Sequence, residues 1–360
     1  MHVLMFGVGE NPQTFVRNQI RFLQESGAKV SIWEGKSPPR LVEKAIATVE
    51  ARYGWTPDLL GKRAALLRAA DVYHFQWPHS LSRYVRVIQP FNKPTILSLR
   101  GRAISIVPYI PGYESYARSL REALPTCSGY HCVSKAILRD GEALGLAPER
   151  ARVIYTALDL SFFSLPETPP ASEPLQIVMI GSLIWRKGYE YAVCALERLV
   201  REHGLNARLV IIGEGEDDAR IRYTAADLGV TDRVILTGKL PPDGVRRLLH
   251  ESHILLHTAL SEGIANAVVE GMACGLPVVT ARSGGMDEAV NDGVEGFITP
   301  PRDVRAMAAA LARLAGDPAL CRQFGLAGRE RALKQFAPDR QAAEFIDLYR
   351  FAIQNHARKV

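Results

Sequence analysis

The sequence contains no long uncharged hydrophobic run, and this absence excludes one large class of protein. No stretch approaches the ~18 consecutive apolar residues of a membrane-spanning helix, although 47% of the 360 residues are hydrophobic. The first residues, MHVLMFGVGENP, form a short apolar run with no basic residue before it and with glycines after it. We therefore expect a first buried strand here, and not a signal peptide, in a cytoplasmic protein.

Cysteine is scarce as well. The five cysteines are odd in number and include no C-x-x-C pair, a pattern that disfavours both a disulfide framework and a cysteine-based zinc site. Nine histidines are scattered through the chain without a His-x3-His pair on a predicted helix, and there are no internal repeats. We interpret His74, His79 and His131 as core or loop histidines, and the cysteines as small core residues.

The net charge of +6 is unevenly distributed along the chain. Residues 1–158 contain 21 Lys and Arg against 12 Asp and Glu, whereas residues 159–360 contain 23 against 26. A basic N-terminal half favours an anionic partner, such as anionic lipid headgroups or a phosphorylated acceptor. Scattered solvated arginines would give the same count. Nucleic acid is disfavoured, because the basic residues form no dense run and are not interleaved with aromatics.

A chain of this length suggests two domains, at ~150 residues for each. Residues 159–174 contain four prolines and no apolar periodicity, which is typical of a linker. We predict a first domain over residues 1–160, a linker over 161–174 and a second domain over 175–337. A last helix is predicted over 338–356, and a return of this helix to the first domain is left open.

Short apolar runs alternate with helical patterns in both halves, and two of the predicted helices are Gly188–Arg201 and Ala265–Cys274. This alternation predicts parallel sheets covered on both faces. The expected fold is α/β, with two Rossmann-like doubly wound domains facing a central cleft. The predicted strands are His2–Phe6, Lys29–Trp33, Val72–Phe75, Thr95–Leu99, Gly129–Val133, Arg152–Ile154, Gln176–Ile180, Arg208–Ile212, Arg233–Leu236, Ile254–His257, Pro277–Thr280 and Gly296–Ile298.

The most informative segment is residues 258–300, where a loop and then a helix follow the strand that ends at His257. Glu262 lies just before this helix, whose first amides, from Gly263 to Asn266, lack partners within the helix and can hold an anion. Glu270 lies eight residues later, and both carboxylates can accept hydrogen bonds from hydroxyl groups of one extended ligand. Taken alone, the pair has an equally good explanation without a ligand, in which Glu262 caps the helix and Glu270 is a solvated helix residue.

The wider segment, S-E-G-I-A-N-A-V-V-E-G-M-A-C-G-L-P-V-V-T, resembles the donor-site signature of family 4 glycosyltransferases, in which E-G-x6-E leads into A-x-G-x-P-V-V. The likeness continues through residues 283–285, S-G-G, and 296–297, G-F. The resemblance implies a GT-B fold and the retaining transfer of a sugar from a nucleotide diphosphate. It also implies that Glu262 contacts the donor sugar and Glu270 the ribose. The residues implied at the helix start are Gly263, Ile264, Ala265 and Asn266.

A second motif, G-S-L-I-W-R-K-G at residues 181–188, ends a strand and opens a helix. Basic side chains at such a turn can neutralise a departing diphosphate. The motif is similar to the family's G-R-L-x-x-x-K-G element, which implies that Gly181 and Lys187 bind the donor. Ser182 replaces the usual arginine, and Arg186 is the candidate substitute, although a solvated side chain is a competing interpretation of Arg186. We predict Lys187, Arg186 and Glu262 as catalytic residues.

Two short glycine patterns follow strands. Gly7 and Gly9 come after the first strand, where glycine lets the backbone approach a phosphate, and we assign both to donor binding. Residues 213–215, G-E-G, resemble the family's G-x-G loop. A simple turn and a nucleotide contact are equally good interpretations of this loop.

The first half otherwise resembles the family more loosely. Residues 11–15, N-P-Q-T-F, resemble the S-E-T-F helix start, and residues 99–102, L-R-G-R, stand where many members have His-Gly. Arg100 cannot act as a neutral acceptor or shuttle a proton, but it can bind a phosphate or an acidic acceptor. We assign Asn11, Arg100 and Gly101 to the acceptor side.

No Asp-x-Asp pair, which many metal-dependent glycosyltransferases use, occurs in the sequence. Together with this absence, the family resemblance implies a metal-independent, cofactor-free hexosyltransferase that uses a nucleotide sugar. Its acceptor would be a glycan, a lipid-linked molecule or a phosphorylated molecule, in cell-envelope or exopolysaccharide synthesis. Peripheral contact of the basic domain with the inner face of the membrane is left open. The alternatives are a catalytically silent nucleotide-sugar-binding subunit, because Ser182 and Arg100 depart from the family, and a nucleotide-sugar epimerase.

Overall fold

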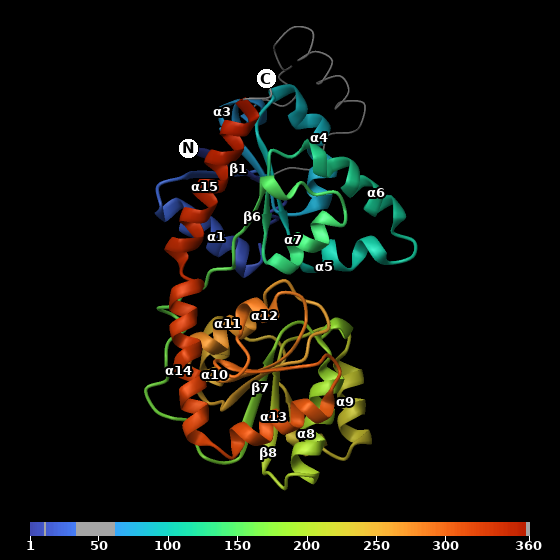
Figure 1. The fold of residues 1–360 in the computed structure, drawn as a ribbon, viewed down its shortest axis with the longest axis vertical. Coiled ribbons are helices and arrows are strands. Elements are labelled where there is room, and N and C mark those ends of the chain that lie inside the picture. Colours follow the sequence, from blue (N-terminus) through green and yellow to red (C-terminus); the bar gives the residue numbers. More distant parts are fainter. Residues whose placement is uncertain (11, 34–61, 358–360) are drawn as a thin grey trace. The chain divides into compact units, whose positions relative to one another are not determined.

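The computed structural model describes residues 1–10, 12–33 and 62–357, and it divides into two compact units (Figure 1). The first unit combines Met1–Ala157 with the segment that begins at Pro338, and the second unit is Leu158–Ala337. Among the described residues, no helix is long and apolar enough to cross a membrane.

Parallel strands form the sheet of the first unit in the order β2-β1-β3-β4-β5-β6. The chain runs outward from β1 in both directions, so the order reverses between β1 and β3. Ligands of open parallel sheets bind beyond the carboxyl ends of strands at such a reversal. The strands are β1 (His2–Phe6), β2 (Lys29–Ile32), β3 (Val72–Phe75), β4 (Thr95–Leu99), β5 (Gly129–Cys132) and β6 (Ala151–Val153).

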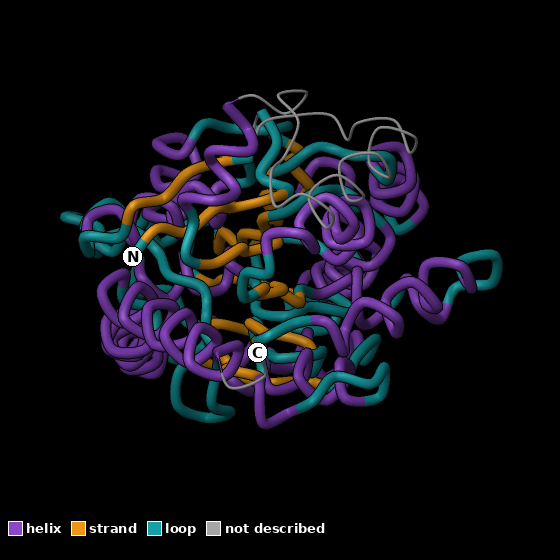
Figure 2. Tube along the Cα trace, turned by 90° about the horizontal axis from the view of Figure 1, so that it is seen from above, coloured by secondary structure: helices purple, strands orange, loops and turns teal. Residues whose placement is uncertain are grey.

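Helices cover both faces of this first sheet (Figures 1 and 2). On one face, α1 (Thr14–Glu25) and α15 (Pro338–Ala357) pack together, and α15 inserts Phe345, Leu348 and Tyr349 into the core. The other face carries α4 (Pro78–Ile88) and α7 (Lys135–Glu142), with α6 (Glu114–Ala123) packed against α4. The described part of this unit also contains the α-helices α3 (Lys62–Ala69) and α5 (Gly101–Ser105).

The second unit repeats this architecture with the strand order β12-β11-β10-β7-β8-β9. Here the order reverses between β7 and β10, which pair directly and in parallel. The strands are β7 (Leu175–Ile180), β8 (Ala207–Ile212), β9 (Val234–Leu236), β10 (Ile254–His257), β11 (Val278–Ala281) and β12 (Gly296–Thr299).

The second sheet is likewise covered on both faces. One layer contains α8 (Tyr189–Arg201), α9 (Asp218–Asp227) and α13 (Val304–Ala315). The opposite layer contains α11 (Asn266–Ala273) and α14 (Pro318–Gln335). The other two helices are α10 (Pro242–His250) and α12 (Met286–Ala289).

The predicted doubly wound α/β architecture is confirmed. Every predicted strand is present, and each begins and ends within one residue of its predicted bounds. The buried strands read as continuous apolar runs because both faces of a parallel sheet are covered. Residues 154–174, which include the predicted linker, contain no helix or strand, and α15 begins at Pro338.

Candidate active site

Residues from both predicted donor motifs gather at the carboxyl ends of β7 and β10, where the order of the second sheet reverses. Gly181 directly follows β7, and Glu262 follows β10 after a short loop. The sequence predicted each motif separately. The fold joins them, because β7 and β10 are neighbours in the sheet although they lie far apart in the chain.

The basic turn after β7 is fixed against β10 by its own backbone. Trp185–Lys187 form a 3-10 turn, and Gly188 then adopts the left-handed conformation with φ 66°. A Cβ on Gly188 would lie 2.6 Å from the carbonyl oxygen of Thr258, so only glycine permits this approach. The hydroxyl of Thr258 donates to the carbonyls of Lys187 and Gly188 at 3.0 and 2.8 Å. This packing holds Arg186 and Lys187 over the end of β10.

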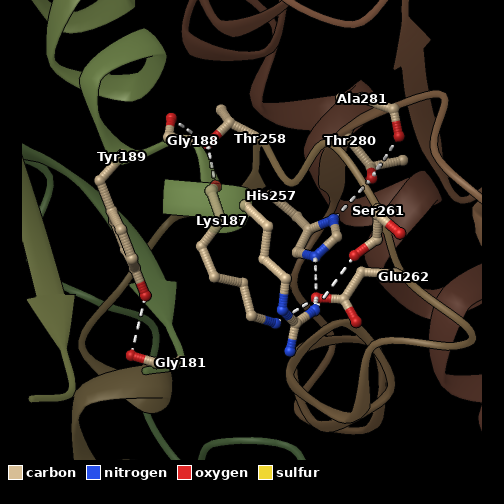
Figure 3. Close-up of polar contacts among 11 residues, drawn as sticks. Gly181, Lys187, Gly188, Tyr189, His257, Thr258, Ser261, Glu262, Thr280 and Ala281 are labelled. Atoms are coloured by element: carbon tan, nitrogen blue, oxygen red, sulfur yellow. Dashed lines mark hydrogen bonds and ion pairs between the residues drawn. The ribbon is translucent and has the colours of Figure 1, made fainter. Parts of the chain in front are cut away.

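Two cations converge on the carboxylate of Glu262 (Figure 3). Nζ of Lys187 donates a hydrogen bond to Oε1 of Glu262. Nη1 of Arg186 lies 3.6 Å from the same oxygen and donates to the carbonyl of Ser261 at 3.1 Å. Nε2 of His257 lies 3.8 Å from that oxygen. Glu262 is buried, with 9% of its surface exposed, so the cluster is shielded from bulk water.

The charges of this cluster do not cancel. Burial alone would raise the pKa of Glu262, but Lys187, His257 and Arg186 together hold this pKa far below its usual value. Burial also lowers the pKa of His257, so its imidazole is neutral near pH 7. One carboxylate therefore faces two cations, and the site carries a net positive charge that attracts an anion.

The start of α11 adds open amides to the site. Its N-cap residue, Ala265, has no side chain that could cap the helix. Throughout the described ranges, no carbonyl accepts a hydrogen bond from the amides of Asn266 and Ala267. Amides of this kind carry the positive end of the helix dipole and suit a phosphate group.

Glu270 lies farther along the same helix, and burial raises its pKa to about 7. In the part of the chain that the structure describes, its carboxylate forms no hydrogen bond or ion pair. Such a group can accept hydrogen bonds from hydroxyls without first losing a protein partner. The side chain of Glu270 is half-buried, so its carboxylate is only partly exposed to solvent.

Glycine loops close around the site. A Cβ on Gly284 would lie 1.7 Å from the carbonyl oxygen of Glu262, so the S-G-G element packs directly on the loop that carries this carboxylate. A Cβ on Gly213 would lie 1.9 Å from the carbonyl oxygen of Gly181, and one on Gly215 would lie 2.3 Å from that of Leu183. Close backbone packing therefore explains the G-x-G pattern, whether or not this loop also touches a ligand.

The remaining predicted residues belong to the first unit. Gly7 follows β1 with φ 76°, and a Cβ there would lie 2.3 Å from Oγ of Ser80, whereas Gly9 stands in open space. Arg100 follows β4, and Gly101 begins α5. Asn11 lies outside the described residues.

Sequence reasoning missed His257 and Thr258, which hold the carboxylate and the basic turn in place. Their position at the end of β10, directly before the donor signature, was the available signal. His74 and His131 are buried and hydrogen-bonded, which confirms that they are core histidines. Within the described ranges, no three His, Cys, Asp or Glu side chains are grouped so that they could hold a metal ion.

Two family models together match almost the whole chain. The model described as Glycosyltransferase Family 4 matches residues 12–162, and the one described as Glycosyl transferases group 1 matches residues 163–331. The amylovoran biosynthesis glycosyltransferase AmsK of Erwinia amylovora is 32% identical over 294 residues, which cover 78% of this chain and 70% of AmsK. This chain belongs to the group 1, family 4 glycosyltransferases.

Other comparisons agree with this family. The D-inositol 3-phosphate glycosyltransferase of Acidothermus cellulolyticus is 30% identical over 224 residues, which cover 58% of this chain and 50% of that protein. Anabaena HepE, solved in complex with UDP, superimposes with a TM-score of 0.76 and 18% identity, covering 96% of this chain and 100% of HepE. The structural likeness confirms the GT-B fold, and the family makes the chain a glycosyltransferase.

Proposed function

We propose that this glycosyltransferase moves a hexose-type sugar from a nucleoside diphosphate to a glycan, lipid-linked or phosphorylated acceptor, with retention and without a metal ion. The observation that carries the proposal is the contact between Lys187 and Glu262, which joins the two donor motifs at one sheet edge. The complex of HepE with UDP supports UDP-linked sugars as the first donors to test.

Binding of the donor would rearrange the ion pair. In the structure, Glu262 is the carboxylate that compensates Lys187 and Arg186. A diphosphate competes for these two cations and also meets the open amides at the start of α11. The released carboxylate of Glu262 can then accept hydrogen bonds from hydroxyls of the donor sugar. Glu270 would accept hydrogen bonds from the ribose.

The same groups explain catalysis. Negative charge grows on the diphosphate as the bond to the sugar breaks, and fixed cations and amides that face this charge lower the barrier. The leaving phosphate oxygen itself can take the proton of the acceptor hydroxyl. In this scheme the acceptor attacks from the face of the departing phosphate, so the anomeric configuration is retained.

Replacement of Lys187 by Ala tests the proposal. We expect kcat to fall by about 10²-fold or more, the loss typical when one electrostatic donor is removed from a reacting centre. The assay is release of UDP from a panel of UDP-sugars in the presence of candidate acceptors. Lys239→Ala is the matched control, because Lys239 is an exposed lysine of the same unit. Near-normal turnover by Lys187→Ala would refute the assigned role.

The names of two relatives and two features of the first unit support a glycan, phosphorylated or membrane-bound acceptor. AmsK is named for the biosynthesis of amylovoran, and the Acidothermus relative is named for D-inositol 3-phosphate, a phosphorylated molecule. The excess of positive charge in residues 1–158 supports contact with an anionic surface. Exposed Tyr109 and Tyr113, in the segment that joins α5 to α6, add apolar surface to this basic unit.

A further inference from the structure

Arg100 is a partly buried cation, and no carboxylate among the described residues compensates its charge. Its guanidinium carbon lies 4.5 Å from the ring centroid of Phe15 and 6.0 Å from that of Trp77. Its Nη2 donates to the amide oxygens of Gln19 and Gln76 at 3.2 and 2.9 Å. These four partners are all uncharged. Among the described residues, no Asp or Glu forms an ion pair with Arg100.

The titratable groups behind Arg100 are neutral as well. Burial lowers the pKa of His74 to about 3, with a smaller contribution from Arg100, and burial raises the pKa of Tyr349 well above its usual value. Nδ1 of His74 bonds the hydroxyl of Tyr349 at 2.8 Å, and its Nε2 bonds Ser98 at 2.8 Å. Ser98 bonds His131, whose other ring nitrogen bonds the carbonyl of Ile154. This chain of hydrogen bonds is complete and supplies no negative charge.

An uncompensated buried cation is costly, and its donors should find acceptors. Burial lowers the pKa of Arg100 to about 9, which reflects this cost. Two buried nitrogen atoms of the cluster, Nε of Arg100 and Nε2 of Gln19, have no hydrogen-bond partner among the residues that the structure describes. Nη1 of Arg100 has no acceptor within the described ranges either, but it retains some contact with solvent. What the cluster lacks is an acceptor that carries negative charge.

The position of the cluster suits a ligand. Arg100 follows β4 and Gln76 follows β3, so both lie at the carboxyl edge of the first sheet, beside the reversal between β1 and β3. Gly7 and Gly9 follow β1 at the same edge. Open parallel sheets bind their ligands at this place.

We propose that Arg100 anchors an anion subsite of the first unit, which takes a phosphate or carboxylate group carried by the acceptor. The proposal rests on the proposed function, which assigns the acceptor to this unit. Phe15, Trp77, Gln19 and Gln76 fix the plane of the guanidinium before the ligand arrives. A fixed guanidinium presents paired N–H groups to two oxygen atoms of one anion, which a lysine ammonium cannot do.

Isothermal titration with inorganic phosphate at constant ionic strength tests the subsite. The Lys187→Ala protein is used first, because the cationic site of the second unit also attracts phosphate. We expect saturable binding, which Arg100→Gln in the same background should weaken by about tenfold or more. Arg100→Lys should bind with intermediate affinity. Equal phosphate affinity with and without Arg100→Gln would overturn the proposal.

A second set of titrations identifies the source and type of the anion. Glycerol 1-phosphate should bind at least as tightly as inorganic phosphate, whereas glycerol should not bind. Malonate tests a carboxylate in place of a phosphate. Binding of phosphate with exclusion of both glycerol 1-phosphate and malonate would describe a site for the free ion, and would overturn the assignment to an acceptor.

Thermal unfolding distinguishes a ligand-binding arginine from a structural one. In phosphate-free buffer, Arg100→Gln should unfold at the wild-type temperature or above it, because an uncompensated buried charge is removed. Phosphate should raise the melting temperature of Lys187→Ala but not that of the double variant. A lower melting temperature for Arg100→Gln, with no effect of phosphate on Lys187→Ala, would show that Arg100 is only structural.

Titration with UDP distinguishes a failure of the anion subsite from a failure of the proposed donor site. Arg100→Gln should bind UDP as the wild type does, because the donor groups lie in the second unit. If wild-type protein binds phosphate through Arg100 but binds no nucleotide or nucleotide sugar, the proposed function fails while the anion site stands. If nucleotide binds and the Arg100 variants leave phosphate binding unchanged, only the anion subsite fails.

Discussion

Glu270, which we propose as a ligand of the ribose, carries a cost in stability. Its folded-state pKa of about 7 lies above the ~4.3 expected for an unfolded chain. The folded protein therefore holds this proton more tightly, and stability is lost as the pH rises from about 4 through 7. We expect Glu270→Gln to raise the melting temperature by a few degrees at pH 8, with a smaller difference at pH 5. Calorimetry of both proteins at the two pH values measures this.

A second measurement compares the affinity of the same two proteins for UDP and for 2′-deoxy-UDP. If Glu270 accepts hydrogen bonds from ribose hydroxyls, the wild type should prefer UDP to 2′-deoxy-UDP, and Glu270→Gln should lose most of this preference. A variant that keeps the full preference would place the ribose elsewhere. A variant that is no more stable than wild type at pH 8 would show that the carboxylate carries little burial cost.

Gly284 and Gly293 form a matched pair of positions for testing how tightly the Glu262 loop is held. Both have positive φ, 55° and 76°, but only a Cβ on Gly284 would collide with the carbonyl of Glu262. Ala at Gly293 should cost about 1 kcal/mol in unfolding free energy from backbone strain alone. Ala at Gly284 should cost clearly more and should weaken UDP binding, because the loop must shift. Urea titration and calorimetry measure both effects, and equal losses for the two variants would contradict this reasoning.

At the residue scale, the sequence identified residues that the structure brings together, but it did not identify the residues that hold them in place. Lys187 and Glu262 were found because each stands in a motif with a recognisable order of residues. Thr258 and His257 were missed because their roles depend on which strands are neighbours, and β7 pairs with β10 across more than seventy residues. The cluster around Arg100 was missed for the same reason, since its members lie on α1 and in the loops that follow β3 and β4.

Helix α15 belongs to the first unit although it lies far along the chain from the other residues of that unit. Phe345 is fully buried in the core that α15 shares with β1 and α1. We expect Phe345→Ala to lower the free energy of unfolding by about 3 kcal/mol or more. Arg350→Ala on the same helix should change it by less than about 0.5 kcal/mol, because Arg350 is exposed. Urea unfolding measures both, and a small effect of Phe345→Ala would mean that α15 contributes little to the first unit.

The bounds of helices and strands could be predicted from neighbouring residues, but the packing partner of a helix could not. Strand bounds were predicted within one residue because continuous apolar runs end at turn residues. The helix after β10 was predicted over Ala265–Cys274 and spans Asn266–Ala273. Local pattern could not fix the partner of α15, because its apolar face would suit any complementary surface. Only the packed structure shows Phe345 and Tyr349 against the first sheet.

At the scale of the whole molecule, the uneven charge and the exposed tyrosines predict an interaction with anionic membranes. Tyr109 and Tyr113 are 58% and 45% exposed, and exposed arginines, Arg102 and Arg118, lie nearby in the chain. Aromatic side chains and arginines together suit the headgroup region of a bilayer. We expect the wild type to float with vesicles that contain anionic lipid, and to do so less at high salt because screening weakens the attraction.

Flotation of two variants tests whether the segment with Tyr109 and Tyr113 is responsible for vesicle binding. The double variant Tyr109→Ser, Tyr113→Ser should lose much of the vesicle-bound fraction, since it removes the apolar part of the contact and leaves the charge. Tyr223→Ser is the matched control, because Tyr223 is 71% exposed but lies in the second unit. Equal flotation of both variants would assign membrane binding to charge alone. No dependence of the wild type on anionic lipid would contradict membrane contact, and a soluble acceptor would then be the better target for assays.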